Sequence, residues 1–156
     1  MKSTITLLLM TFLTALVTYG QGPDLMAEKT SISSLCNEYS AAWATEDIEK
    51  FSSLFSHSAD LVIFDGSSTY NGWEAWQRRL TSSFPKARDV KISFRDHNIQ
   101  VNTAGDAAFL TASEDVNYTE NGKSFSFKGM RVTWILLKMD GSWVIIHGHW
   151  SVPVKD

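Results

Sequence analysis

The feature that most constrains this chain is a long hairpin near its C-terminal end. Two runs rich in β-branched and aromatic residues, 130–138 and 143–153, flank the step Asp140-Gly141. Glycine accepts the positive φ that a tight turn requires, so the pattern predicts two antiparallel strands. Apolar residues occur at both parities of both runs, which indicates that neither face is simply solvated. We expect one face to cover the core and the other to meet a pocket or a second subunit.

The first 22 residues are typical of a secretory signal peptide. Lys2 provides the positive charge near the N-terminus, and residues 5–17 form the apolar segment. Residues 18–20 are typical of a cleavage site. We therefore expect a secreted or periplasmic protein in which residues 23–156 form one domain. The apolar segment is too short for a confident membrane span, and no second candidate follows. No contact with a membrane is expected after cleavage.

Composition narrows the possible partners. The formal net charge is −3, and Lys and Arg do not form a run, so a nucleic-acid partner is not expected. Cys36 is the single cysteine and cannot form an internal disulfide. It falls on an apolar helical stripe, which favours a small buried side chain over a reactive thiol.

Hydrophobic periodicity divides the rest of the chain into helices followed by strands. A period near 3.6 changes to a period of two after Pro85. The expected helices cover residues 26–44, 46–55 and 72–84, and the expected strands cover residues 59–65, 90–101, 106–118, 124–138 and 143–153. Helices followed by strands joined through hairpin turns favour an α+β fold, with the helices on one face of a curved antiparallel sheet.

Three local signals refine this outline. Asn71 and Glu74 have the spacing of a capping box that starts the third helix. The inward parity changes near Asp96-His97, which predicts a bulge or bend. Gly129 lies in the middle of a long strand and predicts a kink there.

The closing pattern Trp-x-x-x-His-x-His-x-Ser, over residues 143–151, follows Arg131-x-Thr133. Together with the order of elements, it resembles the SnoaL-like branch of the nuclear transport factor 2-like superfamily. The ending is also similar to the association domain of calcium/calmodulin-dependent kinase II. The resemblance implies a cone-shaped, cystatin-like α+β fold, with three N-terminal helices on the concave side of the sheet. It also implies a pocket between helices and sheet, and homodimers through sheet faces. It implies no single activity, because related proteins include isomerases, dehydratases, cyclases and binding or assembly modules.

Ketosteroid isomerase is the relative with the sharpest chemistry. By resemblance, Tyr39 matches its oxyanion-hole tyrosine, Asp65 its general base, and Trp150 the tryptophan that lines its pocket. Ile135 stands where that enzyme keeps a protonated aspartate, and Gly66 replaces the proline after its base. The resemblance therefore covers only part of that catalytic set.

Other polar residues of the hairpin are also candidates. Arg131 should be paired, either with an internal carboxylate such as Asp65 or Glu114 or with a carboxylate on a ligand. Thr133 and His149 are polar exceptions on an apolar ribbon. A metal site is not expected, because the histidines of the closing pattern, His147 and His149, lack a positioned third ligand. No cofactor is indicated either.

The register of the hairpin decides which candidates share a face. A two-residue turn places Arg131 opposite Trp150, and Thr133 opposite Gly148. A three-residue turn with a bulge places Arg131 opposite His149. The sequence leaves both alternatives open.

Three functions are compatible with these residues. The first is binding of a small, largely apolar organic molecule, with Asp65, Arg131 and Tyr39 as polar contacts, and with Trp43 and Trp150 among the aromatic walls. The second is an isomerase, dehydratase or cyclase that uses Asp65 as general base. The third is an assembly module without a ligand, with Trp143 and the two closing histidines at its contact. Asp65 could equally cap the loop that follows it.

Overall fold

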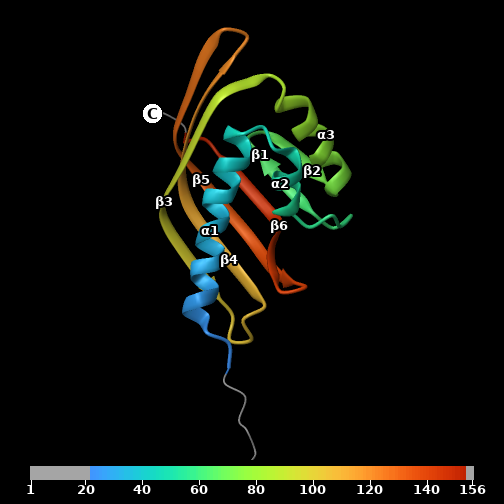
Figure 1. Ribbon diagram of the computed structural model, residues 1–156, viewed down its shortest axis with the longest axis vertical. Coiled ribbons are helices and arrows are strands. Elements are labelled where there is room, and N and C mark those ends of the chain that lie inside the picture. The colour runs from blue at the N-terminus through green and yellow to red at the C-terminus, as the bar shows by residue number, and fades with distance from the viewer. Residues whose placement is uncertain (1–21, 154–156) are drawn as a thin grey trace, which may run out of the picture.

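The computed structural model describes residues 22–153, which form three helices and a six-stranded sheet (Figure 1). The predicted signal peptide lies outside these residues except for its last position. The helices are α1 Leu25–Ala44, α2 Ile48–Ser53 and α3 Trp73–Ser83, and the strands are β1 Val62–Asp65, β2 Ser68–Asn71, β3 Ala87–Val101, β4 Ala107–Glu120, β5 Lys123–Met139 and β6 Ser142–Ser151.

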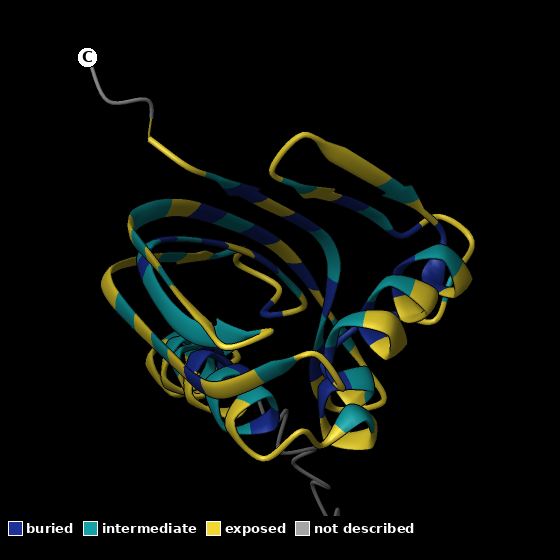
Figure 2. Ribbon diagram, turned by 90° about the horizontal axis from the view of Figure 1, so that it is seen from above, coloured by how far each residue is buried: buried dark blue, intermediate teal, exposed yellow. Residues whose placement is uncertain are grey.

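The sheet is mixed, with the strand order β2-β1-β6-β5-β4-β3. Strands β1 and β6 are parallel, and every other neighbouring pair is antiparallel. The helices lie on one face of the curved sheet, and the buried residues lie between the two layers (Figure 2). The predicted α+β fold is therefore confirmed, with one parallel pair added to the expected antiparallel sheet.

Helix α1 buries the stripe that its sequence predicts. Ile32, Leu35, Cys36 and Tyr39 are all buried, since spacings of three and four residues place them on one face. Asp24 caps the helix, because its side chain accepts hydrogen bonds from two backbone N–H groups of the first turn. Cys36 is 1% exposed, as expected, and burial raises the pKa of its thiol to about 12.

The start of α3 differs from the prediction. Asn71 does not cap the helix, because it belongs to the short strand β2, which the sequence did not predict. The residue before the helix is Gly72, whose φ of 79° suits glycine, and no side chain caps this end. The inward face of α3 nevertheless follows the helical period, with Trp73, Trp76 and Leu80 buried.

Bulges bend the long strands. The register of β3 against β4 shifts between Arg88 and Lys91 and again between Arg95 and Asn98, so the predicted bend near residues 96–97 is confirmed. In β5, two residues lie opposite Asp115 of β4. Each extra residue increases the local twist, and the sheet curves around the helices.

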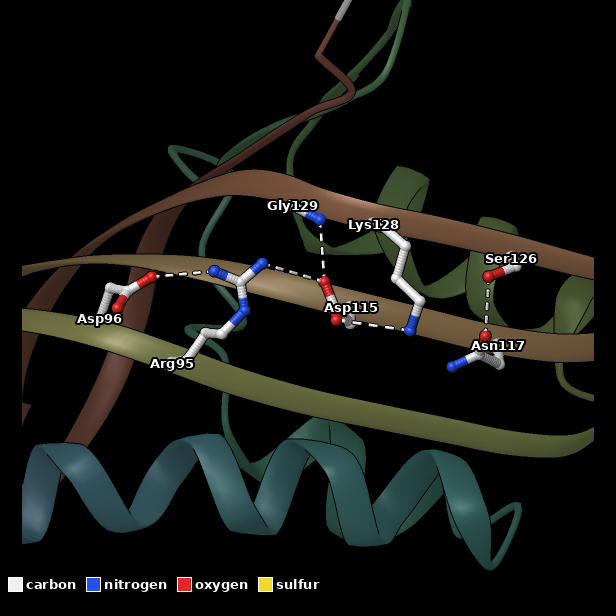
Figure 3. Close-up of polar contacts among 7 residues, drawn as sticks. All are labelled: Arg95, Asp96, Asp115, Asn117, Ser126, Lys128 and Gly129. Atoms are coloured by element: carbon white, nitrogen blue, oxygen red, sulfur yellow. Dashed lines mark hydrogen bonds and ion pairs between the residues drawn. The ribbon is translucent and has the colours of Figure 1, made fainter.

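The bulge of β5 is held on the outer face of the sheet by Asp115 (Figure 3). Its Oδ1 accepts hydrogen bonds from the backbone N–H of Gly129 at 2.8 Å and from Nη2 of Arg95 at 3.3 Å. Its Oδ2 is 3.4 Å from Nζ of Lys128. The bond from Gly129 is the main reason why the pKa of Asp115 is lowered. Gly129 has a φ of 65°, so the predicted kink is confirmed.

Candidate functional site

A cavity of about 570 Å³ lies between the helices and the concave face of the sheet. This volume is within the usual range for small-molecule sites. Much of its wall is apolar or aromatic, with Tyr39 and Trp43 from α1, Trp76 and Leu80 from α3, Ile92 from β3 and Trp150 from β6. The elements that form it come from both halves of the chain.

Tyr39 lies at the centre of an aromatic cluster beside the cavity. Its ring centroid is 6.0 Å from that of Trp150, 5.5 Å from that of Trp134 and 5.0 Å from that of Phe51. Trp76 stacks on Trp150 with centroids 6.2 Å apart. Burial, together with the nearby charge of Glu114, raises the pKa of Tyr39 well above its ordinary value. Tyr39 is therefore a neutral phenol at physiological pH.

Glu114 is the main polar residue that sequence reasoning did not select as a site residue. It continues the inward series Ala108, Leu110 and Ala112 along β4, and it is only 1% exposed. Its Oε1 has no hydrogen-bond partner within residues 22–153. Burial raises the pKa of Glu114 to about 8, and the negative charge of Asp65 adds to the shift. At neutral pH the cavity therefore contains a protonated carboxyl group, which can donate a hydrogen bond.

Asp65 lines the same cavity from the end of β1. Its Oδ2 is 3.5 Å from Nη2 of Arg79 on α3, and the two side chains are 30% and 37% exposed. Asp65 is paired in register with Trp150 of β6, and the backbone N–H of Gly66 donates to the carbonyl of Trp150 at 3.0 Å. The parallel pairing of β1 and β6 thus places a carboxylate beside the aromatic wall.

The β5–β6 hairpin has a register that combines a predicted turn with an unpredicted bulge. Lys138 pairs with Trp143, as a two-residue turn requires. Farther from the turn, Ile146 is an extra residue in β6, and the register shifts by one. Thr133 therefore pairs with His149, which neither sequence alternative predicted at that point.

Three expected site residues lie away from the cavity. Arg131, Thr133 and His149 do not line it, and their strands instead bury Val132 and Trp150 on the concave side. Arg131 is exposed and forms no ion pair within the part of the chain that the structure describes, so the expected pairing with Asp65 or Glu114 is wrong. The expected site residues that do line the cavity are Asp65, Tyr39, Trp43 and Trp150.

Gly148 gives Trp150 its position. A Cβ atom at Gly148 would overlap the six-membered part of the Trp150 ring, which folds back along the strand toward it. Glycine is thus needed here for a close approach between side chain and backbone, rather than for an unusual φ. The indole then reaches both the cavity and Tyr39.

The two closing histidines lie by Phe64 of β1. The Phe64 ring is 5.3 Å from that of His147 and 5.8 Å from that of His149, in edge-on contacts. Among residues 22–153, no group of three side chains suited to binding a metal is found. Over the same residues, none of the helices has the length and apolar character needed to cross a bilayer.

A curved sheet, three helices on its concave side and a cavity between them define the nuclear transport factor 2-like class of folds, also called cystatin-like. A family model for the SnoaL-like domain matches residues 32–155, and the chain belongs to this family. A comparison with curated proteins finds no match.

Solved structures share the fold at low sequence identity. A nuclear transport factor 2-like superfamily protein from Salmonella enterica has a TM-score of 0.75 at 20% identity, covering 84% of this chain and 94% of its own. A protein from Novosphingobium aromaticivorans, provisionally assigned as a scytalone dehydratase, has a TM-score of 0.75 at 14% identity. The match covers 83% of this chain and 87% of that protein. A protein from Xanthomonas campestris, provisionally assigned as a calcium/calmodulin-dependent protein kinase II association domain, has a TM-score of 0.68 at 23% identity. The match covers 80% of this chain and 87% of that protein.

Replacing Glu114 with glutamine will change how stability depends on pH. The pKa of Glu114 is about 8 in the folded protein, against an ordinary value of 4.5. The folded state therefore binds more protons than the unfolded state between these pH values. This group makes the free energy of unfolding fall as pH rises, by up to about 1.4 kcal/mol per pH unit.

Chemical denaturation at pH 5 and pH 8 measures this effect. Relative to the Glu114→Gln variant, the unmodified protein should lose stability as the pH increases. Glu74→Gln is a control because that side chain is 89% exposed. A stability difference between protein and Glu114→Gln variant that stays constant over this range would show that Glu114 does not titrate as described.

Proposed function

We propose that the protein binds a small, largely apolar organic molecule in the cavity, and that the molecule carries a hydrogen-bond acceptor oxygen. The observation that carries this proposal is Glu114, a buried carboxyl group with an unpartnered oxygen in an aromatic cavity. A buried polar group without a partner costs free energy. A ligand oxygen that accepts a hydrogen bond from protonated Glu114 removes that cost.

Two indole groups and Asp65 support a neutral ligand. The indole N–H groups of Trp76 and Trp150 also lack partners within the described residues, and both can only donate. A ligand carboxylate would be repelled by the negative charge of Asp65. A neutral ketone suits these donors and the apolar walls.

Benzophenone is a suitable first probe, because it is a neutral aromatic ketone that can be photo-crosslinked. We expect saturable quenching of tryptophan fluorescence when benzophenone is added. Replacing Glu114 with leucine should weaken its affinity about tenfold by removing the hydrogen bond, whereas Glu114→Gln retains a donor and should bind more tightly than Glu114→Leu. Thr133→Val, outside the cavity, is the control.

Irradiation of the complex then locates the probe. Mass spectrometry should find benzophenone attached to cavity residues such as Leu80 or Met130. The proposal fails if binding is not saturable, or if attachment occurs only on the outer face around Ile135, which is 42% exposed.

A second candidate function is acid–base catalysis of the isomerase, dehydratase or cyclase kind. It is favoured by two carboxyl groups of different environment in one cavity. Glu114 holds its proton near neutral pH, whereas Asp65 pairs with Arg79. In this reaction Asp65 removes a proton from the carbon next to a ketone, and Glu114 and Tyr39 hydrogen-bond to the oxygen as it becomes an enolate.

Proton exchange tests this second candidate directly. With 2-tetralone in deuterated buffer, the protein should accelerate deuterium incorporation at the carbons next to the carbonyl, as followed by nuclear magnetic resonance. Asp65→Asn should abolish the acceleration, and Glu114→Gln should reduce it. Asp60→Asn, an exposed change just before β1, is the matched control. Equal exchange with and without protein would exclude this chemistry for 2-tetralone.

We also propose that a second copy of the chain covers the outer face of the sheet. Phe109 of β4 pairs with Ile135 of β5 there, and both are 42% exposed. Leu137 is 38% exposed on the same strand. Trp143 does not belong to this face, contrary to the assembly hypothesis, because it is buried and its Nε1 donates to Glu28 of α1 at 2.8 Å.

Sedimentation velocity at micromolar concentration should find a dimer. Ile135→Lys should shift it to monomer, because a charge would be buried at the contact. Met26→Lys is the control, since Met26 is 72% exposed on α1. A monomer in the unmodified protein at this concentration would rule out the proposed contact.

A further inference from the structure

The concave face of the β4–β5 hairpin carries an aromatic surface that continues from the cavity. We call this surface the outer shelf, and it consists of Val116, Tyr118, Phe125 and Phe127. The Tyr118 ring is 5.0 Å from that of Phe125 at 14° and 6.4 Å from that of Phe127 at 16°, measured between centroids. The rings are thus nearly parallel and present a flat surface.

The opposite face of the same hairpin is polar. Asp115 contacts Lys128, and the side-chain oxygen of Asn117 accepts a hydrogen bond from Ser126 at 2.8 Å (Figure 3). The strands therefore alternate between a polar outer face and an aromatic concave face. A concave face that only met water would be polar as well.

The outer shelf is apolar without being buried. Leu110 and Trp134 occupy the same concave face nearer the helices and are both 0% exposed. Tyr118, Phe125 and Phe127 are only half-buried. Apolar surface left in water is unfavourable, so an occupant of this shelf gains free energy by covering it.

The shelf and the cavity form one continuous surface. Val116, Tyr118 and Phe127 line the same cavity as Glu114 and Trp150. A molecule seated at Glu114 therefore meets the shelf if it extends outward along the hairpin. The cavity is also lined by Arg79, Lys86 and Glu120, which carry charges of both signs.

We propose that the outer shelf is a second subsite and that the ligand is elongated. Its inner part, with the acceptor oxygen, lies at Glu114, and a flat neutral extension lies on Tyr118 and the neighbouring phenylalanines. This inference rests on the proposed binding function and specifies the shape of the ligand. The shelf is a specificity determinant, because it distinguishes long ligands from short ones.

Benzophenone and 4-phenylbenzophenone form a matched pair of probes that differ by one flat ring. The unmodified protein should bind the longer probe about five- to tenfold more tightly, as expected for one added aromatic contact. Tyr118→Thr and Phe125→Thr should each reduce the ratio of the two dissociation constants toward one. Threonine keeps the preference for a strand while it removes the ring.

Met26→Thr is the control, since Met26 is 72% exposed on α1, away from the cavity and from the proposed contact between copies, and should keep the ratio of the unmodified protein. Melting temperatures of the variants verify that each is folded, and the two shelf variants test the same point independently. The inference is overturned if the ratio in the unmodified protein is near one, if both shelf variants keep it, or if the control loses it.

The two proposals fail in different ways. If benzophenone itself does not bind, the proposed function fails and the shelf has no ligand to extend. If benzophenone binds and the added ring brings no gain, only the second subsite is refuted.

Discussion

The curvature of the sheet is the constraint on which the rest of this structure depends. Helices that packed on a flatter sheet would close the layer between them, since protein interiors are dense. The bulges at residues 89–90, 96–97, 128–129 and 146 bend the long strands, so the sheet is concave on the side of the helices. Asp115 fixes one of these bends through the backbone of Gly129. The cavity is the volume that the bent sheet leaves between itself and α1 and α3.

Some bulges and turns could be predicted from the sequence, and others could not. Periodicity predicts the helices and their buried faces, because each inward residue follows a fixed spacing. Gly129 and the Asp140-Gly141 turn are visible because glycine marks an unusual φ. The bulge at Ile146 has no such mark, since it adds one apolar residue to an apolar strand. A two-residue turn with an unbroken register would place Arg131 opposite Trp150, whereas Val132 lies there.

The inward position of Glu114 could have been predicted from the sequence. It follows Ala108, Leu110 and Ala112 at alternate positions, so the parity of β4 already points it inward. Its neighbour Asp115 is also acidic and lies on the outer face, where it accepts hydrogen bonds. Two adjacent carboxyl groups thus have opposite environments. The pKa of Glu114 is raised by burial and that of Asp115 is lowered by hydrogen bonds.

The pairing of β1 with β6 has a consequence for how the cavity comes into being. Asp65 and Trp150 are neighbours in the sheet although most of the domain separates them along the chain. Contacts between distant segments form only at a cost in loop-closure entropy. Until β6 inserts beside β1, the aromatic residues of the cavity have no common wall and are open to water. The binding site is therefore a property of the completed sheet, and grafting α1 or the C-terminal hairpin alone onto another protein would not transfer it.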